Sequence, residues 1–338
     1  MFLLIRIFLG ISHIILSNYN VQHCCSCCAF QIDLSGDVGD AVPYKKLTQD
    51  SLNVGAGFLD SPCLTKYIRL LDSIGGAVLE NIITSKDNPV IKLYQKLSSS
   101  KKERLQYGLF VLEGVRIVED AIRENADISH LIFTKNTFDK LGADWVQADL
   151  RDAKILVISN ELGNRIASTE STQGVFAICR IPVQKRLNFA DNGRYVVLYG
   201  LQDPGNAGMI IRTADALGID GIILSGTCEL YSPKVIRSTM GSVFRIDIMT
   251  ENDTDRLFEM LAESGVESSA AVIDKDAVKV TDCHFEGRQA VFIGNEGNGL
   301  PHEVSQRCTR RITIPMNGNI NSLNAAMAAG ILMWELKK

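Results

Sequence analysis

Three stretches in the second half of the chain place polar side chains in a glycine-containing loop that directly follows an apolar segment. Each stretch reads as the end of a strand, a turn rich in Asn and Gly, and the start of a helix. In an open α/β sheet, ligands bind at the carboxyl ends of the strands, where such loops lie. We therefore expect ligand binding at these loops, which span residues 203–214, 293–300 and 314–324.

The last of these loops combines strand, turn and helix signals most completely. Residues 311–316 alternate and are β-branched, and Pro315 closes the strand. Residues 317–321 have turn composition, because Asn and Gly tolerate positive φ. Ser322 is then predicted to cap an Ala-rich helix that runs to Lys338.

Arg212 carries the strongest functional signal among single residues. It lies on a helix whose other residues, Met209, Ile210, Ile211 and Ala214, are apolar, and a charge in that setting needs a partner. The other polar residues are open to a second interpretation: Asn206 and Asn324 as turn formers, and Glu296 as a loop charge.

Several common enzyme classes lack their signatures here. Gly294, Gly297 and Gly299 do not have dinucleotide-binding spacing, and no P-loop lysine occurs. The five histidines form no metal pair at helical spacing, and no serine sits in a Gly-x-Ser-x-Gly setting. These absences disfavour a dehydrogenase, a kinase and a serine hydrolase, and no metal site is predicted.

The composition is that of a globular protein with one large or two ordinary domains. The chain has 338 residues, 46% hydrophobic and 22% charged, with a net charge of −4. It is therefore not a basic nucleic-acid binder as a whole, but residues 81–110 are locally basic. This local excess indicates either a phosphate-facing patch or a solvated helix face, and it comprises Lys86, Lys92, Lys96, Lys101, Lys102 and Arg104 against Asp87 and Glu103.

Residues 1–80 show no evident core pattern. Residues 1–17 are mostly apolar, with Arg6 and His13 among them, which is consistent with a signal sequence or a short anchor. We favour an extension outside the functional core over a targeting segment, because the folded pattern begins abruptly near Ile82. Four of the nine cysteines cluster within residues 24–28, and the scattered ones are predicted to be free thiols, so we expect a reducing, cytoplasmic location without membrane association.

From residue 81 onwards, strands alternate with helices. We predict an α/β protein with a smaller domain at 81–181, a linker at 182–193 and a larger domain with a mostly parallel, two-sided sheet at 194–338. Predicted helices lie at 89–97, 115–123, 160–167, 209–217, 233–242, 254–264 and 301–308. Predicted strands lie at 109–112, 130–134, 154–158, 175–180, 195–201, 220–225, 244–249, 269–273, 290–293 and 311–316, and 98–102 and 202–208 are predicted turns.

Taken together, the three loops resemble the three motifs of the SpoU (TrmH) family of RNA ribose 2′-O-methyltransferases, in the SPOUT superfamily. The matching forms are N-x-G-x-x-x-R-T-A at 206–214, I-G-N-E-G-x-G-L at 293–300 and I-P-M-x-G-x-x-x-S-L-N at 314–324. Residues 88–92, 110–114 and 171–175 resemble the family's L30e-like RNA-binding domain. The resemblance covers residues 81–338.

This resemblance implies a trefoil knot in the C-terminal domain, bound S-adenosyl-L-methionine and a homodimer. It assigns catalytic positions to Arg212, Asn206, Glu296, Ser322 and Asn324. Cofactor contacts fall on Gly294, Ile314, Leu323, Leu224 and Met316. The RNA contacts that we expect are the basic residues Lys92, Lys96, Lys101, Lys102 and Arg104 of the locally basic segment, together with Arg237.

The reaction that the resemblance implies asks for little acid–base chemistry. The sulfonium methyl is already activated, so the enzyme must align a ribose 2′-OH with it and let the proton leave. A guanidinium is a poor base, so we expect Arg212 to hold the hydroxyl or the adjacent phosphate, and the phosphate to accept the proton. The expected substrate is structured 23S-type ribosomal RNA; the alternatives are tRNA or an RNA-binding relative without catalysis.

Overall fold

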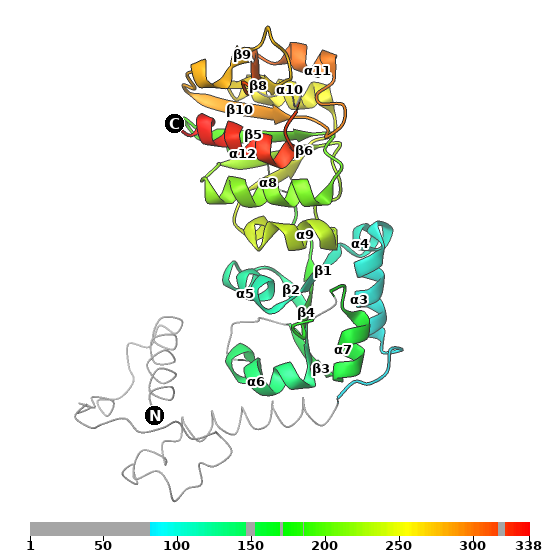
Figure 1. Ribbon diagram of the computed structural model, residues 1–338. Helices are drawn as coiled ribbons and strands as arrows, with labels where there is room; N and C mark the ends of the chain where they lie inside the picture. The colour runs from blue at the N-terminus through cyan, green and yellow to red at the C-terminus, as the bar shows by residue number, and fades with distance from the viewer. Residues whose placement is uncertain (1–81, 147–152, 170–171, 185, 317–321) are drawn as a thin grey trace, which may run out of the picture. The chain divides into compact units, whose positions relative to one another are not determined.

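The computed structural model describes residues 82–146, 153–169, 172–184, 186–316 and 322–338 (Figure 1). All of these belong to one compact unit, residues 66–338. The predictions for residues 1–80 and for the turn at 317–321 fall outside the described residues. The trefoil knot that the resemblance implies stays a prediction.

The first half of this unit is built on a four-stranded mixed sheet with helices on both faces. The strand order is β1-β4-β2-β3, with β2 and β3 parallel and the other pairs antiparallel. One face packs on α5 and α6, and the other on α3 and α7. The elements are α3 (Pro89–Ser99), α4 (Lys101–Tyr107), β1 (Leu109–Glu113), α5 (Val115–Arg123), β2 (Ile128–Thr134), α6 (Lys135–Val146), β3 (Lys154–Ile158), α7 (Asn160–Ile166) and β4 (Val175–Arg180).

The second half is built on a seven-stranded sheet whose neighbouring strands are all parallel, in the order β7-β6-β5-β10-β8-β11-β9. The predicted parallel sheet is confirmed. Its elements are β5 (Arg194–Tyr199), α8 (Pro204–Ala216), β6 (Gly221–Ser225), α9 (Pro233–Thr239), η3 (Ser242–Phe244), β7 (Ile248–Thr250), α10 (Thr254–Glu263), β8 (Val266–Ala271), β9 (Val278–Lys279), η4 (Val280–Asp282), β10 (Arg288–Ile293), α11 (His302–Arg307), β11 (Arg310–Thr313) and α12 (Ala325–Leu336).

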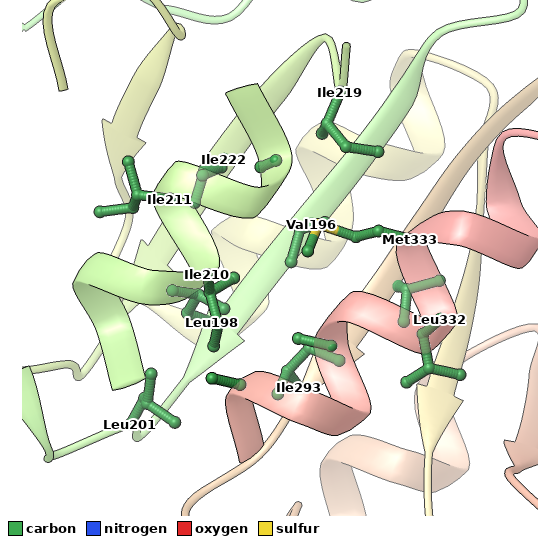
Figure 2. Close-up of a cluster of buried hydrophobic side chains, with 14 of the residues drawn as sticks. Val196, Leu198, Leu201, Ile210, Ile211, Ile219, Ile222, Ile293, Leu332 and Met333 are labelled. Atoms are coloured by element: carbon green, nitrogen blue, oxygen red, sulfur yellow. The ribbon is translucent and has the colours of Figure 1, made fainter. Parts of the chain in front are cut away.

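Both faces of the large sheet are buried, as its near-continuous apolar strands require. Alternate residues of β5 point to opposite faces: Val196 and Leu198 pack under α8 and α12, whereas Tyr195 and Val197 pack under α10 and α11. Figure 2 shows the first of these cores, in which side chains of α8 and α12 meet those of β5, β6 and β10. The two helices that follow the first and third loops therefore lie on one face of the sheet, and they contact each other.

Helix α9 takes part in the cores of both halves. Its Val235 is completely buried in the core under α8, while the adjacent Ile236 is buried in the core of the small sheet. The helix also packs tightly against α8: a Cβ on Gly208 would lie 2.4 Å from the Cβ of Ser238. Glycine is required at this crossing, because any side chain would push the two helices apart.

Two predicted turns are largely helical. The predicted turn at 202–208 is wrong because α8 begins at Pro204: the Asp203 side chain caps it by accepting from the amide of Asn206, and proline suits the first helical position. The predicted turn at 98–102 is confined to Ser100, whose hydroxyl accepts from the amide of Glu103 and starts α4.

Other element limits also differ from the prediction. The cap of α12 is Asn324, which accepts from the amides of Ala326 and Met327, and not Ser322. The predicted strand at 244–249 shortens to β7, because Met240 and Gly241 adopt positive φ, end α9 and lead into η3. Helices α4 and α6 and strand β9 were not predicted. No helix in the described ranges has the length and apolar content that a membrane crossing requires.

Candidate active site

The loops after β5, β6 and β10 meet at the carboxyl edge of the large sheet, because parallel strands end on the same side. The Gln202 amide nitrogen donates to the carbonyl of Gly226 at 2.9 Å, which joins the loops after β5 and β6. The Asn295 amide nitrogen donates to the carbonyl of Gly200 at 3.0 Å, which joins the loops after β5 and β10. Side-chain amides thus hold these three loops in one assembly.

Glu296 fastens the second loop to the first. Its carboxylate accepts from the backbone amides of Gln202 at 3.1 Å and Asp203 at 2.9 Å, and from the side-chain amide of Asn206 at 3.2 Å. Partial burial alone would raise the pKa of this carboxyl, but these hydrogen bonds favour the charged form, and the pKa lies below its ordinary value. Glu296 is therefore a fixed anionic acceptor at neutral pH.

Asn206 connects this assembly to the third loop. Its side-chain oxygen accepts from the Asn324 amide nitrogen at 3.0 Å, while the Asn324 oxygen caps α12 by accepting from Ala326 N at 2.9 Å. A continuous chain Glu296–Asn206–Asn324 therefore links one residue from each of the three motifs, across 90 and 118 positions of sequence. The structure brings these three predicted site residues together.

Arg212 lies farther along the same helix as Asn206. Six residues at 1.5 Å each place it about 9 Å along α8 from Asn206. Its side chain is exposed and forms no hydrogen bond or ion pair with any other described residue. The partner that the sequence argument demanded is thus absent within the described chain, which leaves the five N–H donors of the guanidinium available to a ligand. Ser322 is also exposed.

The residues assigned to the cofactor divide into two groups. Gly294 starts the second loop, where a Cβ would lie 2.3 Å from backbone atoms of Gly299 and Leu300, and Leu323 is 41% exposed beside the third loop. Ile314 and Met316 are half-buried. Leu224 is a different case: its side chain packs in the core with 4% exposure, and its carbonyl accepts from Glu251 N. The prediction that Leu224 contacts the cofactor is therefore wrong, because its side chain is buried in the core and its carbonyl already accepts a hydrogen bond.

The residues predicted to contact RNA are exposed, with one exception. Lys96, Lys101 and Lys102 are exposed on α3 and α4, and Lys92 is exposed but pairs with Asp87 at 2.8 Å. The prediction that Arg104 contacts RNA is wrong, because its guanidinium is buried against Glu229 and only 4% of the residue's surface is exposed. Arg237 is exposed on α9 and donates to the Ser168 hydroxyl at 2.9 Å.

Sequence reasoning assigned no role to Asn295, which organises the second loop. Besides its bond to Gly200, its side-chain oxygen accepts from the amides of Gly297 at 2.9 Å and Asn298 at 3.1 Å. An Asn within a glycine-rich loop often accepts from the backbone amide two residues further on, which is a recognised turn signal. That signal could have identified Asn295 in advance.

Comparison with known proteins agrees with this arrangement. The family model of the SpoU rRNA Methylase family matches residues 193–334, and that of the MRM3-like substrate binding domain matches residues 88–177. The chain is 30% identical over 257 residues to the 23S rRNA (guanosine(2553)-2′-O)-methyltransferase RlmP of Bacillus subtilis, covering 75% of this chain and 98% of that protein.

Two solved structures extend the comparison to the fold. The AdoMet-bound rRNA methyltransferase from Sinorhizobium meliloti superposes with a TM-score of 0.68 at 31% identity, over 76% of this chain and 97% of that one. The SpoU methyltransferase AviRb from Streptomyces viridochromogenes, in complex with AdoMet, gives a TM-score of 0.68 at 25% identity, over 74% and 97%. The chain therefore belongs to the SpoU (TrmH) family and is an RNA methyltransferase.

Proposed function

We propose that this protein transfers the methyl group of S-adenosyl-L-methionine to the 2′-OH of a ribose in structured ribosomal RNA of the 23S type. The observation that carries the proposal is the chain Glu296–Asn206–Asn324 at the start of α8, with the unpartnered Arg212 on the same helix. The names of the relative from Bacillus subtilis and of the structure from Sinorhizobium meliloti support ribosomal RNA as the substrate. Transfer RNA is the alternative substrate.

The residues at the loops fit this cofactor. Leu323 offers exposed apolar surface and Ile314 and Met316 offer partly exposed apolar surface, which suits the face of an adenine ring. Gly294 lets the backbone of the second loop fold closely on itself, so backbone groups rather than side chains line that wall. Bound there, the cofactor supplies a methyl group already activated by its sulfonium.

The protein's own residues then position the ribose. Arg212 holds the phosphate or hydroxyl next to the reacting oxygen with charge-assisted hydrogen bonds. Its guanidinium keeps its proton, so the RNA phosphate is the proposed acceptor of the hydroxyl proton. Asn206 is fixed by Glu296 on one side and Asn324 on the other, so α8 presents Arg212 in a constant orientation. Ser322, exposed beside Asn324, is the remaining candidate for contact with the ribose.

We assign the grip on RNA to the smaller domain, proposed at 81–181, and the transfer to the domain proposed at 194–338, with 182–193 between them. Lys96, Lys101 and Lys102 are exposed and form no ion pair with a described residue, so they remain available to phosphates. Arg237 on α9 is a further exposed cation, and it donates to the Ser168 hydroxyl of the smaller domain. The location proposed is the cytoplasm, in keeping with the free thiols Cys179, Cys228, Cys283 and Cys308.

We also propose a homodimer formed through α12. Met327, Ile331 and Trp334 follow one another at helical spacing, and their exposed fractions are 59%, 37% and 59%. Met209 on the neighbouring α8 is 50% exposed. An apolar stripe of this size on a helix is a surface that a second copy of the chain would cover.

The test is the Arg212→Ala variant with unmodified ribosomal RNA. The rate of methyl transfer should fall about 100- to 1,000-fold, because a donor aimed at the reacting centre is lost, while S-adenosylmethionine affinity measured by calorimetry stays unchanged. Arg256→Ala, on the surface of α10, is the matched control. An Arg212→Ala enzyme with wild-type activity would refute the assignment. A wild-type protein that binds RNA but takes up no labelled cofactor would identify a relative without catalysis.

A further inference from the structure

A buried ion pair joins the two halves of the molecule. Arg104, in the last turn of α4, donates from Nε and Nη2 to the two carboxylate oxygens of Glu229, each at 2.6 Å. The side chains are 5% and 13% exposed, and Arg104 also donates to the carbonyl of Leu97. The planar fork makes two parallel bonds, so the pair fixes orientation as well as distance.

Glu229 belongs to the loop between β6 and α9, and this loop is one wall of the candidate active site. Directly before it, the amide of Cys228 donates to the carbonyl of Leu201 at 2.8 Å. Leu201 is followed by Gln202, whose side chain binds Gly226 at 2.9 Å and whose amide binds Glu296 at 3.1 Å. A short path of alternating hydrogen bonds and peptide bonds therefore runs from Arg104 in the small domain to the carboxylate that orders the catalytic loops.

Apolar side chains already bury the surface where the two halves of the molecule meet, without the ion pair. Ile236 of α9 already lies in the core of the small sheet, and Phe110 packs on Tyr231 with ring centroids 4.8 Å apart. Apolar packing is non-directional, and a buried ion pair often stabilises a fold no better than apolar residues of the same volume. The distinctive property of the pair is thus its geometry.

A second ionic contact lies between the same two halves. Arg245, after η3, donates to Asp215 of α8 at 2.9 Å and lies 3.8 Å from Asp120 of α5, a residue of the small domain with 6% exposure. The Asp120 carboxylate also fills the space at Gly241, where a Cβ would come within 2.2 Å of it. Contacts at Glu229 and at α8 therefore constrain the small domain at two separate places.

We propose that Arg104 and Glu229 are positioning residues for methyl transfer. The pair holds the RNA-gripping domain in one orientation against the catalytic loops, and so selects which ribose of a bound RNA reaches Arg212. This inference rests on the proposed function, because it takes the small domain as the RNA grip and Arg212 as the reacting centre. In this inference both residues act through the orientation of the domains, because their side chains are buried against each other.

The test replaces both partners by apolar residues of similar volume, Arg104→Met with Glu229→Leu. This leaves no unpaired charge, so the fold and S-adenosylmethionine affinity should persist. On ribosomal RNA kcat should fall about 100-fold, the order expected for a misplacement of about 1 Å. KM should change little, because Lys96, Lys101 and Lys102 are intact. Sequencing of 2′-O-methylation sites should show methyl groups on neighbouring riboses. The exposed pair Arg180 and Asp127, changed to Met and Leu, is the matched control.

Different outcomes would refute the positioning role of the ion pair and the proposed function. Wild-type kcat and a single wild-type methylation site in the folded double variant would overturn the inference while leaving the function intact. If the double variant does not fold, Arg104→Lys replaces it, because lysine keeps the positive charge but cannot form two parallel hydrogen bonds. The same lowered kcat at unchanged KM is expected. A wild-type kcat in Arg104→Lys would overturn the inference. A wild-type protein that methylates no RNA would refute the proposed function.

Discussion

At the scale of single residues, the active-site network relies on side chains that each serve two partners. Asn206 donates to Glu296 and accepts from Asn324, and Asn324 both donates to Asn206 and caps α12. Glu296 accepts three hydrogen bonds, and its pKa is held below the ordinary value, which excludes it as a proton carrier near neutral pH. The network is thus a device for holding geometry, and the proton is expected to leave through the RNA.

The first prediction concerns the charge of Glu296. In Glu296→Gln the loop loses its charge-assisted acceptor, so the variant should be less stable than wild type at about pH 7. A carboxyl whose pKa is lowered by folding stabilises the fold above its unfolded pKa and loses this effect as pH falls through the folded value. The difference in urea stability should therefore hold down to about pH 5 and shrink below about pH 4.3, the ordinary glutamate value.

Glu303→Gln is the matched control for this experiment. Glu303 is exposed on α11, and its side chain forms no hydrogen bond or ion pair within the described residues. Its substitution should leave the urea midpoint unchanged at every pH. A Glu296→Gln difference that stays constant below about pH 4 would show that the carboxylate charge does not hold the loop.

The second prediction separates the two roles of Asn324. Asn324→Ala should lower the free energy of unfolding by about 1 kcal/mol, the cost of a lost helix cap, and should also lower methyl transfer. Asn324→Asp keeps the capping oxygen but loses the donor to Asn206, so stability should stay near wild type while methyl transfer falls. Thermal unfolding and a labelled-methyl assay measure the two effects. Ser322→Ala should leave stability unchanged, and a loss there would contradict the assignment of the cap to Asn324.

At the scale of elements, the catalytic edge depends on how closely backbone segments approach each other. The second loop folds back on itself, with Asn295 and Gly299 exchanging both backbone hydrogen bonds at 3.0 and 2.9 Å. Gly294 lies directly beneath this return, and α8 and α9 meet at Gly208 in a similar way. Gly294 and Gly208 therefore allow backbone segments to pack closely.

The third prediction follows from this loop. In Gly294→Ala the added Cβ would meet backbone atoms at 2.3 Å, so the loop must shift. Overpacking of about 1–3 kcal/mol corresponds to a loss of about 5- to 150-fold in S-adenosylmethionine affinity if the loop lines the cofactor. Gly297→Ala is the control, because its Cβ would have only one ordinary contact, at 3.6 Å from Asn295. Equal cofactor affinity of the two variants in calorimetry would separate the second loop from the cofactor site.

At the scale of the whole molecule, two features of the surface remain to be matched with partners. The exposed lysines of α3 and α4 suit a phosphate backbone. The apolar stripe of α12 suits a second copy of the chain, and it lies on the helix whose cap, Asn324, belongs to the active-site network. Dimer formation is therefore expected to influence catalysis through α12.

The fourth prediction tests this surface. Trp334→Glu places a charge on the stripe, so the protein should become monomeric and lose methyl transfer, because burying an unpaired charge in an interface is unfavourable. Light scattering after gel filtration measures the mass. Val183→Glu, at a site that is 88% exposed between the two sheets, is the control and should leave mass and activity unchanged. A Trp334→Glu protein of wild-type mass would place the interface elsewhere.

Local sequence patterns determine the fold class and many of the limits of its helices and strands. The alternation of strands and helices, the parallel two-sided sheet and the limits of α5 and β4 all follow from periodicity and composition within short windows. The residue types of the three loops and of Arg212 also pointed to a site, and the structure brings Glu296, Asn206 and Asn324 of these loops together. A local signal was overlooked at Asp203 and Pro204, where the cap and the first helical residue of α8 stand side by side.

Only the tertiary structure decided which polar residues meet. Arg104 has the sequence context of a surface cation, yet it is buried by Glu229, which lies 125 positions away. Asn324 rather than Ser322 caps α12, and Asn206 and Glu296 join across 90 positions. Leu224 and Leu323 are equally apolar, yet one lies in the core and the other at the surface. Hydrogen bonds and burial between distant residues depend on the packing of whole elements, and a local sequence window carries no record of that packing.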